Sequence, residues 1–330
     1  MSGIRIEAPA KLNLCLLVGN RRPDGFHGIE SLFLALAFGD TLYIEEALQE
    51  HSPPVDIRME WYNSQSNGRK FGDLRLFDDF ESWDKTLPPE KNIISRTVSL
   101  FRSRTGYDKR LKIAVEKRIP LGSGLGGGSS DAAAALLALN RLASAGGECP
   151  LDSIALAEVG AELGSDVPFF LNQESAASWV SGRGEIVLPL ALPQAVFGLS
   201  FVLVNPGFPS DTAEAYRLLD TYREKHPVQQ VSLETQKEFF SVQPKNWQFN
   251  NDFLPVFLAK DTNAAAPGNC GTVYREIIGS LRDLGADFAG LSGSGSTCFG
   301  VFSAAHRAAT AVESLLKRWP FVVRTLPLAR

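Results

Sequence analysis

A glycine-rich stretch in the middle of the chain has the composition of an anion-binding loop. Residues 122–130 read GSGLGGGSS, and an alanine-rich run that predicts a helix from about Ser130 follows at once. Each glycine costs about 0.5–1 kcal/mol relative to alanine, so a bound ligand has to compensate. Glycines let backbone N–H groups converge, and the positive end of the helix points into the same loop. The stretch predicts a phosphate-binding loop whose serine hydroxyls could also bind a hydrated Mg2+; a turn needed only for close packing is the alternative.

The loop does not fit the commonest nucleotide-binding patterns. Residues 122–127 match GxGxxG, but the dinucleotide-binding unit needs a strand after the helix with an acidic residue about 20 positions on. Here a second helical pattern, over residues 151–163, follows instead. No lysine follows the glycines as in GK[ST], and the HRD and DFG segments of protein kinases are absent from the sequence. These observations leave a phosphate-binding loop of another type.

Lys11 and Asn13 form a second candidate site. In a strand-like stretch, alternation places these two polar side chains on one face and the neighbouring leucines on the other. A lysine beside an asparagine in an apolar wall is typical of a polar site. An exposed strand face is the alternative.

Asp166 is a candidate general base. It follows a helix stop at Gly164, in the sequence GSDVPFF, on a connection of the kind that carries functional groups. A carboxylate there could accept the proton of a substrate hydroxyl, or it could cap the turn before Pro168. The residues alone do not decide between the two.

Alternating helical and strand patterns must position these side chains. We expect strands over residues 4–18 and 110–120, and a strand pair broken at Gly39-Asp40. We expect helices over residues 92–106, 130–145, 151–163, 211–225, 248–260, 272–284 and 304–318, and strands over 176–205 and around 288–302. The polar segment 50–90 predicts an elaborated surface hairpin or loop. The pattern indicates the α+β class with two domains that meet near residues 172–176.

The composition excludes several functions. The 330 residues carry a formal net charge of -4 without a basic block, which argues against a nucleic-acid-binding surface. The four cysteines are far apart and form no CxxC pair, so we expect reduced thiols and no zinc site. The N-terminus lacks the apolar run of a signal peptide, and no window approaches 18 apolar residues. We therefore expect a cytoplasmic protein with no membrane span.

Three motifs resemble those of the GHMP kinases. PLGSGLGGGSSDAA, over residues 120–133, resembles the phosphate-binding motif of that family. APAKLNLCL, over 8–16, resembles its N-terminal motif, and GLSGSGSTCFGVF, over 290–302, resembles its C-terminal glycine motif. The motifs occur in the order of the family and span nearly the whole chain. From its residues alone, SGSGS at 292–296 predicts a second group of backbone hydrogen-bond donors. The alternative is that these glycines and serines serve packing alone.

The resemblance implies the fold and the chemistry. Residues 1–172 would form an ATP-binding domain with a left-handed crossover, like ribosomal protein S5 domain 2, and residues 173–330 a ferredoxin-like domain. ATP would donate the phosphoryl group and carry Mg2+ largely on its own phosphates, with no metal site built from the protein. Asp166 matches the catalytic aspartate, and Lys11 would orient the hydroxyl and keep Asp166 ionised. The residues implied to contact ATP are Asn92, Lys117, Pro120, Gly122, Ser123, Gly124, Leu125, Gly126, Gly127, Gly128, Ser129 and Ser130.

Finer features resemble one subfamily of these kinases, whose substrate carries a cytidine diphosphate head group. The segments are PAKLNL, RRPDGFH, GSDVPFFL and SGRGE. By this resemblance Asn13 would bind the methylerythritol end of the substrate, and Phe26 and His27 the cytosine. Ungapped counting along residues 205–216 places Tyr216 on the opposite face of the base, with Phe208 as the second choice.

Two other functions remain open at this stage. One is a different GHMP kinase, of the homoserine or mevalonate type, and the other is a non-catalytic relative that binds ATP and a metabolite. The loop together with Lys11 and Asp166 argues against the second. We expect a monomer or a weak homodimer.

Overall fold

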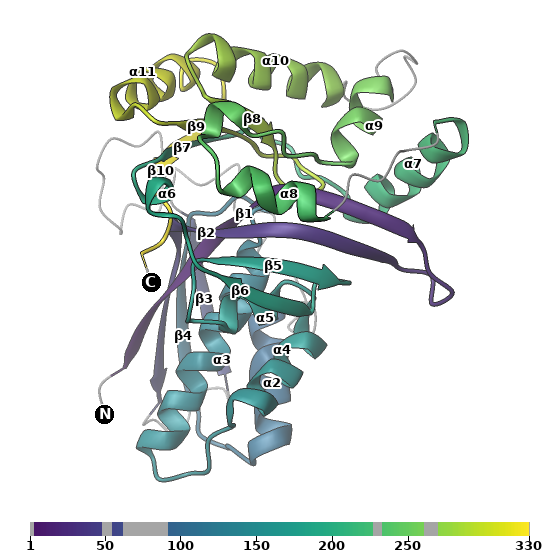
Figure 1. Cartoon of the computed structure of the whole chain (residues 1–330). Coiled ribbons are helices and arrows are strands. Elements are labelled where there is room, and N and C mark those ends of the chain that lie inside the picture. Colours follow the sequence, from purple (N-terminus) through teal and green to yellow (C-terminus); the bar gives the residue numbers. More distant parts are fainter. Residues whose placement is uncertain (1–2, 48–54, 62–91, 227–232, 261–269, 330) are drawn as a thin grey trace. The chain divides into compact units, whose positions relative to one another are not determined.

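The computed structural model describes residues 3–47, 55–61, 92–226, 233–260 and 270–329 (Figure 1). The chain divides into two compact units. The first unit comprises Met1–Ala10, Gly39–Ile119 and Gly127–Gln173, and the second comprises Lys11–Phe38, Pro120–Gly126 and Glu174–Arg330. Among the described helices, none is both long and apolar enough to cross a membrane. The predicted 50–90 insertion lies outside the described residues apart from 55–61, and the domain boundary at residue 172 stays a prediction.

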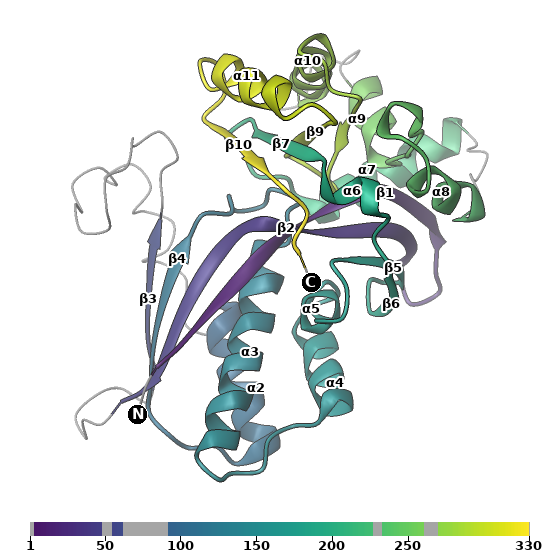
Figure 2. The ribbon, with the colours of Figure 1, turned by 60° about the vertical axis from the view of Figure 1, so that its left-hand side comes forward.

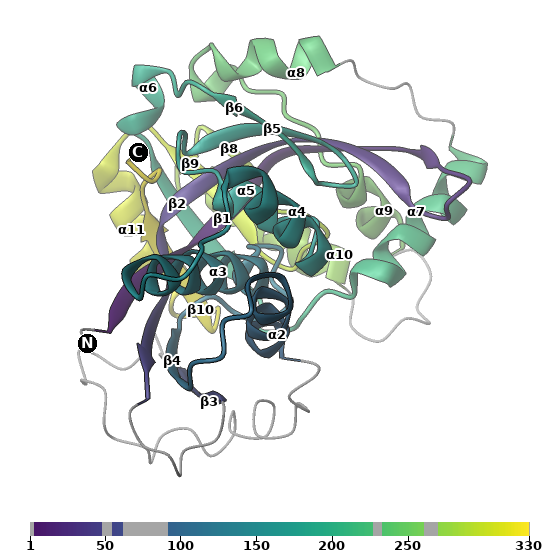
Figure 3. The same ribbon diagram turned by 90° about the horizontal axis from the view of Figure 1, so that it is seen from below.

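The described part of the first unit combines part of a sheet with four helices. Strand β2 (His27–Glu46) pairs antiparallel with β4 (Leu111–Lys117), which pairs in parallel with β3 (Val55–Trp61). Helices α2 and α3 lie side by side on one face of these strands (Figures 2 and 3). The helices are α2 (Ile93–Thr105), α3 (Gly127–Ala145), α4 (Ser153–Leu163) and α5 (Val167–Leu171). The alternation expected over 110–120 is confirmed: Leu111, Ile113 and Val115 are buried, because alternate side chains of a strand face the helices.

The predicted break at Gly39-Asp40 is wrong, because β2 continues through it as a single strand of 20 residues. A Cβ atom on Gly39 would lie 2.6 Å from the Cα of Pro9 in β1 (Ile4–Arg21). Glycine is therefore required for the close approach of two strands, and not for a turn. Asp40 is fully buried, and its Oδ1 accepts hydrogen bonds from the backbone N–H groups of Arg118 and Ile119.

The second unit contains a four-stranded antiparallel sheet in the order β10-β7-β9-β8. Helices α10 (Cys270–Asp283) and α11 (Ala305–Leu315) pack against it and lie on the same side in Figure 1. The strands are β7 (Ser200–Asn205), β8 (Phe288–Leu291), β9 (Cys298–Phe302) and β10 (Phe321–Thr325). In chain order this arrangement is βαββαβ with sheet order 4-1-3-2, which confirms the expected ferredoxin-like arrangement. The sequence analysis did not anticipate β10.

The remaining elements of the second unit surround the first half of β2. That half pairs with β5 (Ala177–Gly182), which pairs with β6 (Ile186–Leu190) across the SGRGE turn. The other elements are α6 (Gln194–Phe197), α7 (Thr212–Lys225), α8 (Leu233–Phe240), the 3-10 helix η3 (Pro244–Asn246) and α9 (Phe253–Lys260). The helices predicted near 211–225 and 272–284 are confirmed, and the α+β class with them.

Candidate active site

The glycine-rich loop leads directly into a helix, as its sequence predicts. Gly122, Gly124 and Gly126 have φ values of 58°, 77° and 73°, in the left-handed region that favours glycine. Helix α3 begins at Gly127, three residues before the predicted start. The N–H groups of its first turn have no partners within the helix and are available to an anion.

The second glycine stretch packs against this loop. Ser292 Oγ donates to the Gly124 carbonyl oxygen at 2.9 Å, and the Thr297 N–H donates to the Ser123 carbonyl at 3.0 Å. A Cβ atom on Gly124 would lie 2.8 Å from the Gly295 carbonyl oxygen and closer still to that of Ser292. Packing therefore requires glycine at position 124, although the alternative that packing alone explains the two stretches stays untested.

Lys11 and Asn13 lie in a buried polar cluster. Their side chains are joined by a 2.5 Å hydrogen bond from Lys11 Nζ to Asn13 Oδ1, and Nζ lies 4.6 Å from the centroid of the Phe33 ring. Asn13 Nδ2 donates to Ser31 Oγ at 2.9 Å, and the Asn13 N–H donates to Ser292 Oγ at 3.2 Å. Lys11 is only 4% exposed, so the exposed-face alternative is wrong.

Lys117 is held between two buried carboxylates, those of Asp40 and Asp131. Its Nζ lies 2.5 Å from an oxygen of each, and all three side chains are at most 4% exposed. Burial lowers the pKa of Lys117, but the two carboxylates outweigh it and raise the pKa. Burial also raises the pKa of Asp131 to about 7, with Asp40 adding to the effect and Lys117 opposing it. Lys117, which was predicted to contact ATP, thus already has two ionic partners. No spacing in the sequence indicated them.

Two polar atoms at the start of α3 lack a partner within the described structure. They are Ser130 Oγ and Asp131 Oδ1, both buried. A buried polar atom without a partner costs roughly 1–3 kcal/mol, so such atoms often mark a place where a ligand or water binds. The position of Ser130, immediately after the glycine loop, makes it the strongest structural indication of a ligand here.

Two other predicted residues lie at helix starts in the first unit. Asn92 caps α2, because its Oδ1 accepts the N–H of Ile94 at 2.9 Å. Asp166 is half-buried immediately before α5, and its side chain makes no capping hydrogen bond. The capping alternative for Asp166 therefore loses its support.

The structure brings together two of the residues predicted to bind cytosine. The His27 and Tyr216 rings stack with centroids 5.0 Å apart, and His27 Nε2 lies 2.8 Å from Asp220 Oδ1. Phe26 is 56% exposed, with the Arg183 guanidinium 5.1 Å from its ring centroid. Phe208 packs on Tyr274 instead, at 6.2 Å. Asp220 was not predicted, although it lies four residues after Tyr216 on a predicted helix, and this spacing places both side chains on one helix face.

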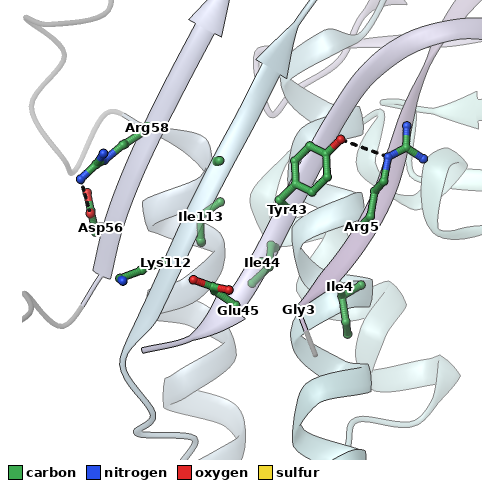
Figure 4. A pocket seen from close by; sticks show the side chains of 11 residues that line it. Gly3, Ile4, Arg5, Tyr43, Ile44, Glu45, Asp56, Arg58, Lys112 and Ile113 are labelled. Atoms are coloured by element: carbon green, nitrogen blue, oxygen red, sulfur yellow. Dashed lines mark hydrogen bonds and ion pairs between the residues drawn. The ribbon is translucent and has the colours of Figure 1, made fainter. Parts of the chain in front are cut away.

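A surface pocket of about 430 Å3 lies elsewhere in the first unit, over strands β1, β2, β3 and β4 (Figure 4). Arg5 Nε donates to the Tyr43 hydroxyl at 3.2 Å, and Arg58 pairs with Asp56 at 3.4 Å. None of the predicted site residues lines this pocket. Two of its charged side chains thus have partners within the lining, as is common on a solvated sheet face, and we do not assign the pocket a role in catalysis.

The glycine loop that leads into α3, the buried Lys11 and the ferredoxin-like sheet are the features that the sequence motifs led us to expect of the GHMP kinase fold. The chain belongs to the GHMP kinase family: the model described as "GHMP kinases N terminal domain" matches residues 92–174, and "GHMP kinases C terminal" matches residues 257–320. The predicted family and fold are thereby confirmed.

The relatives are more specific than the family. The chain is 35% identical, over 93% of its length and 85% of the relative, to a 4-diphosphocytidyl-2-C-methyl-D-erythritol kinase of Anaeromyxobacter sp. (strain Fw109-5). It is 31% identical, over 97% of both chains, to the enzyme of the same name from Thermodesulfovibrio yellowstonii. It also resembles the crystal structure of a 4-(cytidine 5'-diphospho)-2C-methyl-D-erythritol kinase, with a TM-score of 0.69, 28% identity and coverage of 99% of this chain and 100% of the other.

Proposed function

We propose that the protein transfers the γ-phosphoryl group of ATP to the 2-hydroxyl of 4-diphosphocytidyl-2-C-methyl-D-erythritol, in the non-mevalonate pathway to isoprenoid precursors. The names of relatives that share 31–35% of their residues with nearly the whole chain support this substrate. The observation that carries the kinase activity is the glycine loop with the Ser130 hydroxyl at the helix that follows it, which is buried and has no hydrogen-bond partner among the described residues.

The phosphates of ATP are proposed to bind residues 122–130. The backbone N–H groups of the loop and of the first turn of α3 supply donors, and the helix dipole favours negative charge there. Ser130 Oγ fits either a phosphate oxygen or a water of hydrated Mg2+, since it is buried and has no partner among the described residues. Bound Mg2+ would neutralise charge on the phosphates. Asn92 and Lys117 are proposed to contribute near the nucleotide, although each already has a structural partner.

Proton transfer is proposed to depend on Asp166 and Lys11. Asp166 accepts the proton of the substrate hydroxyl as that oxygen bonds to the γ-phosphorus and the bond from the γ-phosphorus to the bridging oxygen of ADP breaks, which releases ADP. The Lys11 ammonium orients that hydroxyl and favours the ionised form of Asp166. Asn13 fixes Nζ of Lys11 through their 2.5 Å hydrogen bond, so the ammonium is held in place before substrate binds.

The cytosine is proposed to bind near the turn that joins β1 and β2. Phe26 offers an exposed ring on which a base can stack, and base–aromatic stacking is typically worth about 1–3 kcal/mol. His27 supplies a hydrogen bond to the edge of the base. Tyr216 already stacks on His27, which supports its assignment to this site over Phe208.

A coupled ADP-release assay tests the proposal. The purified protein is incubated with ATP, Mg2+ and, separately, the cytidine compound, homoserine and mevalonate, and the phosphorylated product is identified by mass spectrometry. We expect turnover with the cytidine compound alone. Turnover of homoserine or mevalonate instead would leave a kinase with a different substrate, and no turnover of any acceptor would favour a non-catalytic binding protein.

A further inference from the structure

Helix α7 presents two side chains to the His27 imidazole. Tyr216 and Asp220 are four residues apart, so they lie on one face of the helix. The Tyr216 ring stacks on the imidazole with 21° between the planes, and Asp220 Oδ1 lies 2.8 Å from Nε2. The Phe253 and Tyr216 rings in turn pack perpendicular to each other, with centroids 5.0 Å apart and 88° between the planes. These contacts fix the orientation of the imidazole plane and the position of one of its two nitrogen atoms, Nε2.

The carboxylate of Asp220 determines which nitrogen carries the proton. A carboxylate only accepts hydrogen bonds, so Nε2 is the donor, and in the neutral ring Nδ1 then keeps its lone pair. The His27 side chain is 5% exposed, which limits its freedom to turn. Among the described residues, Asp220 is the only hydrogen-bond partner of the imidazole. Nδ1 is therefore left as an acceptor for a donor that none of the described residues supplies.

We propose that Asp220 is a positioning residue for base selection: it fixes the His27 tautomer whose Nδ1 accepts a hydrogen bond from the exocyclic amine of cytosine. This inference rests on the proposed function, which supplies the cytidine head group. At the same position uracil carries a carbonyl oxygen, which would face the Nδ1 lone pair and be repelled. A site built to pair a substrate N–H group discriminates strongly against an analogue that lacks it.

The first test compares substrates in the full-length enzyme. We expect Asp220→Asn to raise KM for the cytidine compound by about 10–100-fold and to reduce the enzyme's preference for the cytidine compound over the uridine analogue by about the same factor. KM for ATP should stay unchanged. The asparagine amide can donate to Nε2 and so favour the other tautomer. Asp220→Glu keeps the acceptor and should restore part of the preference. Glu224→Gln removes an exposed carboxylate from the same helix and serves as the matched control.

A double-variant cycle tests whether Asp220 acts through His27. If it does, adding Asp220→Asn to His27→Ala should cause no further loss of base preference. Additive losses would overturn the proposal, as would an unchanged preference in Asp220→Asn. Absence of turnover of the cytidine compound by the wild type would instead refute the proposed function.

Nuclear magnetic resonance of 15N-labelled imidazoles reads the tautomer without any turnover. The chain has four histidines, and the His27→Ala variant assigns the signal. We expect the wild type to carry the proton on Nε2 and Asp220→Asn to shift the population toward Nδ1. A wild-type ring protonated on Nδ1 alone would overturn the inference even if the enzyme is fully active.

Discussion

Replacing Asp131 with asparagine is expected to change how the free energy of unfolding depends on pH. Burial raises the pKa of this carboxyl from 3.8 to about 7 in the folded protein. The folded state therefore binds more protons than the unfolded state between these two pH values. The contribution of the bound proton to the free energy of unfolding is complete below about pH 4 and is lost as the pH rises through 7. An asparagine has no proton to lose and can still accept a hydrogen bond from Lys117.

The expected size follows from the displacement of the pKa. At about 1.4 kcal/mol per pH unit, the change from 3.8 to about 7 amounts to about 4 kcal/mol. The free energy of unfolding of Asp131→Asn, minus that of the wild type, should rise by roughly this amount between pH 4 and pH 7 and then level off.

Urea unfolding at half-unit pH intervals, followed by tryptophan fluorescence and circular dichroism, measures this difference. The matched control is Asp108→Asn, which removes an exposed carboxylate of the same unit and should give a nearly constant difference from the wild type. If Asp131→Asn gives a curve as flat as that of Asp108→Asn, the buried carboxyl is not protonated in the folded state and the reasoning fails.

Three further outcomes concern the proposed function. Gly128→Val should weaken ATP binding at least tenfold by calorimetry. A Cβ atom at this position would lie no closer than 4.0 Å to the described protein (at Ile93), so weaker binding would reflect a clash with ATP; Gly279→Val, also at an open helical position, is the control. Asp166→Asn should lower kcat by about 10²–10⁴-fold with ATP Kd unchanged, and Lys11→Met should also reduce kcat severely; near-normal turnover in either would contradict the proton-transfer assignment. Tyr216→Ala should raise KM for the cytidine compound about 5–150-fold, and an equal rise in KM for ATP would argue for a general structural defect.

The sequence was sufficient for features encoded by neighbouring residues. The glycine loop, the helix after it and helix α2 depend on local backbone preferences, and their patterns predicted them within a few residues. The ferredoxin-like order of the second unit came from family resemblance, because nothing local specifies which strands become neighbours. Gly39-Asp40 shows the limit: the pair is typical of a turn, yet the glycine is there because Pro9 of another strand lies against it.

The polar groups around the site were harder to predict because their partners are distant in the chain. Lys117 bonds with Asp40, 77 residues away, and Asn13 with Ser292, 279 residues away. No local pattern indicates that these residues are partners, and only the fold brings them into buried clusters. The proposed choice of Tyr216 over Phe208 likewise rests on a long-range contact, the stacking of Tyr216 on His27.

The discontinuity of the second unit has a consequence for protein synthesis. All segments of the first unit have left the ribosome once residue 173 has emerged, whereas Lys11–Phe38 belong with segments that extend to the last strand. Leu16 and Val18 are buried in one cluster with residues of β7, β9 and β10. These partners emerge only late in translation, which proceeds at about 5–20 residues per second. The strand that carries Lys11 therefore keeps apolar side chains exposed on the nascent chain, and we expect chaperones to bind it. Chains stopped between residues 173 and 290 should aggregate through it, even though their first unit is complete.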